Sequence, residues 1–323
     1  MEEDTSSRSS HQPRDPIHEA TLWTLRKLKE ATSRHPLDEE TFSAFILSGL
    51  YFTAPLFSAF LGRPEKSTNA SWGIFNKSGG GDDHLSETST GADFCFVLGR
   101  ENEFAEVGFF QAKHLKANKP RTLNVRHGPS ETSGGNTQLA VLLGFACRLM
   151  ASTDAPGFAH FKTIKTNLDA AAYLNKQKEG YITDLTSKIE WVHHIIYHQG
   201  EPTAIPLSKL DRETIIAEVK RKPPRSHKIT HMGSPFSDLI LQAFDSEGSG
   251  WLRIQRSSLD ELLPALAEIS TVIVSDDRGG RALVPKGCSD LTPALDLSAM
   301  PHHANRELWE SLIARPARPR AGP

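Results

Sequence analysis

The residues best suited to chemistry lie within one apolar stretch, 87-ETSTGADFCFVLGRENEFAEVGFFQAKHLK-116. Asp93 precedes the first apolar run, and Gln111 and Lys113 interrupt the second run, among phenylalanines. Because alternate residues of a strand share a face, Gln111 and Lys113 would project together. If an antiparallel partner strand brings Asp93 beside them, a carboxylate, an amide and an ammonium meet in one place.

Such a set suits the hydrolysis of a phosphodiester bond. Magnesium prefers oxygen ligands, which the Asp93 carboxylate, the Gln111 side-chain carbonyl, the Ala112 main-chain carbonyl and waters could supply. A bound metal polarises the scissile phosphate and lowers the pKa of a bound water. Lys113 would orient or deprotonate that water and offset negative charge in the transition state.

The surrounding periodicity predicts a mixed α/β protein. Acidic residues open a second helix, and residues 137–152 carry an amphipathic helical stripe with Asn136 or Thr137 as N-cap. The expected elements are, in chain order, a helix over 16–34, a helix from 38, a short strand over 72–75, strands over 92–99 and 106–115, the helix over 137–152 and a strand over 190–200.

These motifs resemble the PD-(D/E)xK nuclease superfamily. The resemblance rests on Glu87, on Gly91-Ala92-Asp93-Phe94, on Gln111-Ala112-Lys113 and on a following helix that bears Gln138. It covers roughly residues 38–200 and is closest to members whose third motif is QxK. It implies a restriction-endonuclease-like fold, in which helices flank a mixed central sheet. Beyond the region it covers, the pattern of the later residues predicts a C-terminal α/β extension.

The resemblance also implies roles. Asp93 would be the metal-binding aspartate, Gln111 the variant of the acidic ligand and Lys113 the catalytic lysine. Glu87 matches the upstream acid, with Glu39 and Glu40 as rivals on a helix, and Gln138 matches a polar position that some members use near the site.

Gln111 is the departure from the family pattern. A neutral amide in place of a carboxylate removes one negative charge. The site could therefore hold one metal ion or two, and a second acid such as Glu87 becomes more necessary. An alternative reading is a nucleic-acid-binding or scaffold protein that kept the fold and lost turnover. In a simpler alternative, Gln111 and Lys113 decorate an exposed edge strand, although burying an unpaired lysine beside phenylalanines would be costly.

Basic residues crowd the loop that follows the QAK strand. They could bind along a phosphate backbone, with an affinity that falls as salt rises. The residues expected to contact DNA are Lys116, Lys119, Arg121, Arg126 and Gln138, with His127 nearby. A solvated loop is the alternative. The segment 220-KRKPPRSHK-228 is a second candidate, although we expect it to be a plain linker.

Other signals are discounted. His194 and His198 would lie roughly 13 Å apart on one side of a strand, too far for one ion, so these histidines and His193 are read as structural. The glycine runs 79–81 and 134–135 lack a nucleotide-binding spacing, so no nucleotide cofactor is expected.

The composition of the chain indicates its cellular compartment and the kinds of partner to expect. The chain has 323 residues, a net charge of −2 and three separated cysteines, which fits a reducing cytosol and gives no global basic field. The apolar run 43–62 reads as a core helix, kinked or broken at Pro55, and neither a secretory signal nor a membrane partner is expected.

The sequence therefore predicts a cytoplasmic, Mg²⁺-dependent endonuclease, with Mn²⁺ as a substitute, that acts on double-stranded DNA. A homodimer is expected because cutting both strands needs two sites, and defence against foreign DNA is the setting in which many stand-alone members of the superfamily act. An unrelated α/β enzyme or interaction module stays open as a further alternative. The expected divisions are a disordered tail 1–15, a nuclease domain 16–210, an extension or small module 211–300 and a flexible tail 301–323.

Overall fold

The computed structural model describes most of the central part of the chain. The described residues are 16–32, ten positions between 41 and 60, 69–74, 92–100, 104–116, 119–124, 135–197, 202–222, 226–229, 233–244, 250–255, 272–276 and 279–283. The predictions for the two tails and for Pro55 lie outside them.

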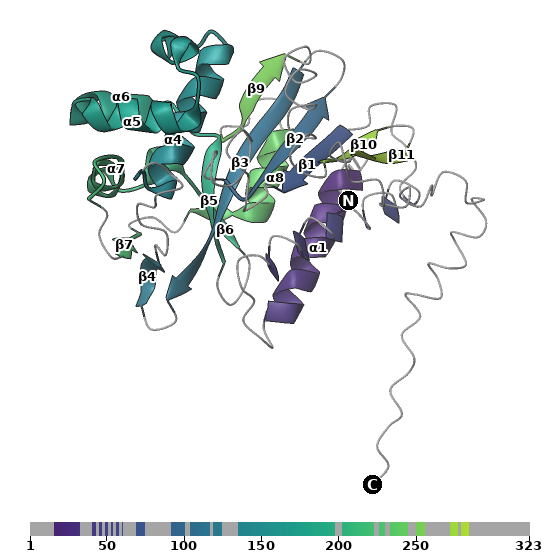
Figure 1. The fold of residues 1–323 in the computed structure, drawn as a ribbon. Coiled ribbons are helices and arrows are strands. Elements are labelled where there is room, and N and C mark those ends of the chain that lie inside the picture. The colour runs from purple at the N-terminus through teal and green to yellow at the C-terminus, as the bar shows by residue number, and fades with distance from the viewer. Residues whose placement is uncertain are drawn as a thin grey trace, which may run out of the picture.

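A mixed β-sheet forms the centre of the molecule (Figure 1). Along its main path the strands follow the order β11-β10-β1-β2-β3-β5-β6-β8. Among these neighbours, β3 and β5 run parallel and the other pairs run antiparallel. The first six strands in chain order are β1 (Asn69–Ile74), β2 (Phe94–Arg100), β3 (Phe104–Lys116), β4 (Lys119–Asn124), β5 (Val192–Tyr197) and β6 (Thr203–Pro206).

Helices cover both faces of this sheet, so the architecture is three-layered (Figure 1). One face packs against α4 (Gln138–Ser152), α5 (Asn167–Lys176), α6 (Glu179–Ser187) and α7 (Arg212–Val219). The other face packs against α1 (Pro16–Thr32), α8 (Phe236–Phe244) and helical residues between 41 and 50. The predicted α/β class with a mixed, helix-flanked sheet is therefore confirmed.

The parallel pairing of β3 with β5 depends on the segment between them. Parallel neighbours need a long crossover, and α4, α5 and α6 provide it on a single face. Gly144 lets α4 and α5 approach closely, because an added Cβ would lie 2.8 Å from the Asn167 carbonyl oxygen. The sequence analysis predicted α4 and β5 and missed α5, α6 and β6.

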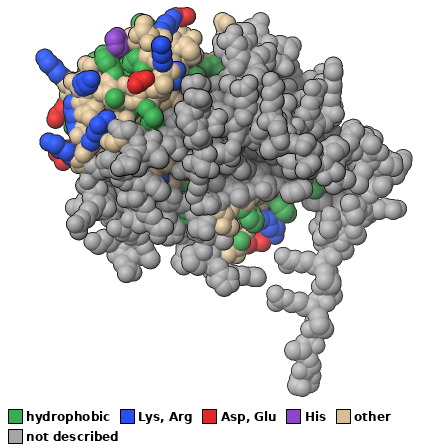
Figure 2. All heavy atoms as spheres, in the orientation of Figure 1, with side chains coloured by type: hydrophobic (Ala, Val, Ile, Leu, Met, Phe, Trp, Pro, Cys, Tyr) green, Lys and Arg blue, Asp and Glu red, His purple; other side chains and the backbone are tan. Residues whose placement is uncertain are grey.

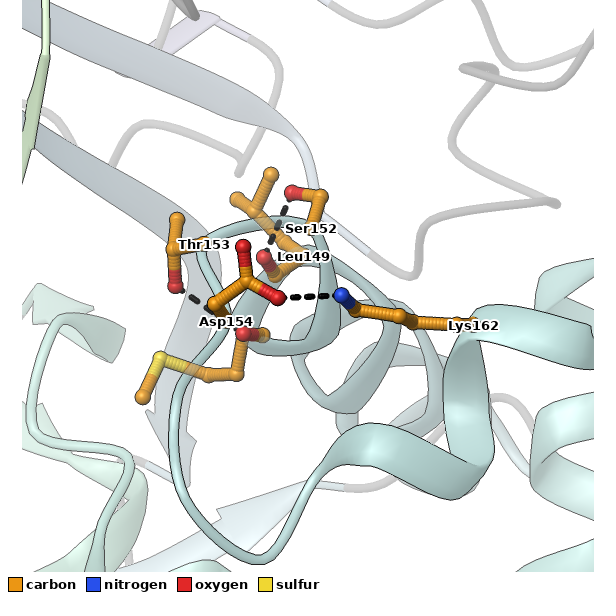
Figure 3. A network of polar contacts seen from close by, with 6 residues as sticks. Leu149, Ser152, Thr153, Asp154 and Lys162 are labelled. Carbon is orange, nitrogen blue, oxygen red and sulfur yellow. Dashed lines mark hydrogen bonds and ion pairs between the residues drawn. The ribbon is translucent and has the colours of Figure 1, made fainter.

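The end of α4 is held by local contacts (Figure 3). The hydroxyls of Ser152 and Thr153 donate to the carbonyls of Leu149 and Met150, and Lys162 donates to the Asp154 carboxylate. These contacts close the turn between α4 and the following short 3₁₀ helix (Ala159–Thr163).

Residues after 233 join the same sheet. Strand β8 (Ser234–Pro235) pairs with β6, β9 (Leu252–Gln255) pairs with β3, and β10 (Val272–Asp276) pairs with β1 and with β11 (Gly279–Leu283). This part of the chain therefore extends the central sheet. In the described part of the chain, no helix combines the length and apolarity needed to cross a membrane.

Candidate active site

Asp93 lies directly beside Gln111. Its main-chain N–H donates to the Phe110 carbonyl at 2.8 Å, and its Oδ2 accepts from the Ala112 N–H at 2.6 Å. Gln111 is the residue between these two anchors, so the antiparallel register of β2 and β3 places Asp93 opposite Gln111. The side chain of Asp93 is only partly buried.

Gln111 and Lys113 project from β3 toward the helices α4–α7. Their neighbours Phe110 and Ala112 belong to the apolar cluster on the opposite face, and strand alternation assigns Gln111 and Lys113 to the α4 side. Gln111 is 1% exposed and Lys113 is 7% exposed. The predicted shared face is thus confirmed, and the edge-strand alternative is wrong because β3 lies between β2 and β5.

Gln138 reaches Lys113 from the first turn of α4. Lys113 Nζ donates to Gln138 Oε1 at 3.0 Å, so the ammonium has a fixed partner inside the protein. The sequence analysis placed Gln138 near the site but assigned it to DNA contact. In the structure it holds the lysine.

The position of Gln138 follows from the cap of α4. Thr137 Oγ1 accepts from the Ala140 N–H and donates to the main-chain carbonyl of Glu218, each at 3.2 Å. Next to it, Asn136 Oδ1 accepts from Arg221 at 2.9 Å. Of the two predicted N-caps, Asn136 and Thr137, the structure has Thr137. Hydrogen bonds of these two residues connect the start of α4 to the end of α7.

His194 is the site residue that sequence reasoning discounted. It pairs in register with Gln111 across the parallel β3–β5 ladder. The preceding pair, Phe110 and His193, stacks on the opposite face with ring centroids 5.4 Å apart, so His194 lies on the same face as Gln111. It is 5% exposed. Asp93, which directly precedes β2, Gln111 on β3 and His194 on β5 are therefore neighbours in one polar row.

His193 fits the structural role that was predicted for it. Its Nε2–H donates to the Gly250 carbonyl at 2.7 Å, and burial lowers the pKa of this imidazole to about 4. His198 lies outside the described residues.

The oxygen donors near Asp93 suit a hard divalent cation. The Asp93 carboxylate and the carbonyls of Gln111 and Ala112 are the oxygen types that Mg²⁺ binds in proteins. Within the described residues, no three His, Cys, Asp or Glu side chains come together as a metal-binding group. A cation held here would meet one carboxylate, and further ligands would have to come from water, from substrate or from Glu87.

Several predicted residues cannot be placed beside this geometry. Glu87, Glu39, Glu40 and Arg126 lie outside the described residues, as does His127. For three others the strand position alone is described. Lys116 is the last residue of β3, and Lys119 and Arg121 belong to β4.

Comparisons with protein-family models, with curated proteins and with solved structures found no match to this chain. The chemistry of the site therefore has to be argued from its own residues.

Proposed function

We propose that this chain is a metal-dependent nuclease of the PD-(D/E)xK type that hydrolyses phosphodiester bonds in double-stranded DNA. One observation carries the proposal. The Asp93 carboxylate accepts a hydrogen bond from the Ala112 main-chain N–H, next to Gln111. Lys113, two residues after Gln111, projects from the same face of β3 as Gln111.

Each residue then has a role. Asp93, Gln111 and the Ala112 carbonyl would hold Mg²⁺, for which Mn²⁺ would substitute. When bound, this cation polarises the phosphate and acidifies a water. The Lys113 ammonium donates to the attacking water or to a phosphate oxygen and offsets negative charge in the transition state. Gln138 keeps Lys113 in position through its Oε1 contact of 3.0 Å.

The alternative function is nucleic-acid binding without turnover. It is favoured by the single carboxylate among the described site residues and by the neutral amide at Gln111. With fewer negative charges, a cation binds more weakly. A protein of this kind would bind DNA and leave it intact.

Plasmid cleavage separates the two functions. Wild-type protein should cut plasmid DNA with Mg²⁺ or Mn²⁺ and stop cutting in EDTA. Asp93→Asn keeps an oxygen acceptor for the Ala112 N–H and removes the charge, and Lys113→Met removes the ammonium while keeping much of the side-chain volume. Each should lower the cleavage rate by about 100-fold or more.

The matched controls are Asp154→Asn and Lys162→Met, the exposed ion pair of Figure 3. They make the same chemical changes elsewhere and should cut as wild type does. Cutting that survives EDTA or Asp93→Asn would contradict the nuclease proposal. Binding of intact plasmid without cutting would favour the alternative.

We place the protein in the cytoplasm because its three cysteines are well separated, and in defence against foreign DNA as the resemblance suggests. A homodimer would supply the two sites that a double-strand cut requires, and sedimentation of the DNA complex would test it.

A further inference from the structure

Two basic segments that are about a hundred residues apart in the sequence form one β-ribbon. Strand β4 pairs antiparallel with β7 (Ser226–Lys228), with Thr122 opposite Lys228 and Leu123 opposite His227. We call this pair, with the preceding turn 220–222, the basic ribbon. Residues 226–228 of the segment 220–228 therefore belong to a strand pair, so a plain linker is the wrong description of this end of the segment.

The ribbon begins at the candidate active site. Strand β4 folds back on the end of β3, where Lys116 pairs with Lys119, three residues beyond Lys113. On the β7 side, Ile229 is buried in a cluster with Ile196 and Ile205. Ile196 is the in-register neighbour of Lys113 on β5. Both strands of the ribbon are thus fixed close to the proposed catalytic lysine.

The turn that leads into β7 is fixed to the same site from the other side. Arg221, which adopts a left-handed backbone conformation (φ 57°), donates to Asn136 at the start of α4. Lys220 Nζ donates to the carbonyls of Asn175 and Gln177, at 2.6 and 2.5 Å, near the end of α5. The backbone before and after residues 223–225 is therefore held by the core.

The ribbon concentrates positive charge in a chain whose net charge is −2. Within it, residues 119–124 contain two Lys or Arg, residues 220–222 and 226–228 together contain four, and none of these residues is Asp or Glu. The surface over α5 and α6 differs, because Lys and Arg alternate there with Asp and Glu (Figure 2). Two of its lysines, Lys162 and Lys188, are neutralised by ion pairs with Asp154 and Asp184.

We propose that the basic ribbon binds the phosphate backbone of duplex DNA and leads it to the site at Lys113. A paired ribbon whose sequence carries several Lys and Arg and no Asp or Glu suits a polyanion, and contacts to phosphates are independent of base sequence. The part of this proposal in which the ribbon leads DNA to a cutting site rests on the proposed nuclease function. The binding surface does not, because it needs neither a metal nor turnover.

Salt-dependent binding tests the surface. A short fluorescent DNA duplex is titrated with full-length protein in EDTA over a series of KCl concentrations, and log Kd is plotted against log [KCl]. Two double variants remove charge from the two halves of the ribbon, Lys119→Gln with Arg121→Gln and Lys222→Gln with Lys228→Gln. Each lost phosphate contact should reduce the slope of this plot by about 0.9, so the slope of each double variant should be lower than the wild-type slope by about 2.

The matched control is Lys165→Gln with Lys178→Gln, two exposed lysines beside α5 and α6. It removes the same charge from the chain and should keep the wild-type slope. Lys222→Arg with Lys228→Arg keeps the charge and should also keep the slope, which separates loss of contact from damage to the fold.

The outcomes distinguish this proposal from the nuclease proposal. Shallower slopes in both ribbon variants but not in the control support the ribbon, even if plasmid is never cut. A wild-type slope in either ribbon variant, or an equal loss in the control, overturns it. If plasmid cutting at limiting DNA also continues at wild-type rate in the ribbon variants, the nuclease stands and the ribbon does not guide its substrate.

Discussion

The two faces of the central sheet differ at adjacent residues of the same strands. Toward α1 and α8, the sheet carries a cluster of buried aromatic side chains, which we call the aromatic face. Phe110 there stacks on Phe94 at 5.2 Å between ring centroids and meets Phe236 and Trp251 edge-on at 5.6 and 5.9 Å. Toward α4, the site face carries Gln111, Lys113 and His194 at the same level of the sheet.

The difference shows which residues the fold requires and which it tolerates. Burying aromatic rings stabilises the sheet through apolar area and ring contacts. Burying a lysine and an amide costs free energy unless both are hydrogen-bonded. Polar residues at the centre of a sheet that could have been apolar are therefore better explained by function than by stability. The predictions below try to break that contrast.

The largest effect is expected on the aromatic face. Phe110→Ala should lower the free energy of unfolding by about 3–5 kcal/mol, because it leaves a cavity among several rings. Urea denaturation measures it, with Phe110→Leu as a milder companion that should cost less than half as much. A loss below about 1 kcal/mol would mean that this face does not dominate stability.

The buried His193 should make stability depend on pH. Its pKa is lowered to about 4 in the folded protein, against an ordinary value of 6.5, so the unfolded state binds the proton more readily. The contribution is intact above pH 6.5 and is lost as pH falls toward 4, by about 3 kcal/mol in total. Urea denaturation at several pH values, with His193→Gln as the comparison, should show a steeper acid slope in the wild type. Parallel slopes would contradict the assignment.

On the site face, Gln111→Glu should strengthen cation binding. The added carboxylate restores the missing charge beside Asp93 and should tighten Mg²⁺ binding about tenfold, equivalent to about 1.4 kcal/mol. Thermal unfolding with and without Mg²⁺ measures this gain. Gln255→Glu adds the same charge at an exposed position and should gain nothing. If Mg²⁺ stabilises neither the wild type nor Gln111→Glu, the cation site is wrong.

The smallest change in stability is expected from Gln111→Leu. A buried amide replaced by an apolar side chain of similar shape should alter the free energy of unfolding by about 1 kcal/mol or less. Metal-dependent cutting should nevertheless disappear, because an oxygen ligand is gone. A loss of several kcal/mol would instead identify Gln111 as a structural residue and remove the contrast between the faces.

Local pattern determined much of the fold. The alternation in β2 and β3, the apolar stripe of α4 and its Thr137 cap could be recognised because each depends on residues a few positions apart. The shared face of Gln111 and Lys113 follows from the same period-two geometry.

Only the tertiary structure decided which distant residues meet. The register that brings Asp93 beside Gln111, the parallel pairing that adds His194, and the pairing of β4 with β7 all join segments far apart in the chain. A strand's side-chain pattern specifies which face is buried but not which partner or register it takes. That choice is made by the packing of the whole sheet, where the crossover α4–α6 fixes β5 next to β3 and the buried Ile229 fixes β7 next to the site.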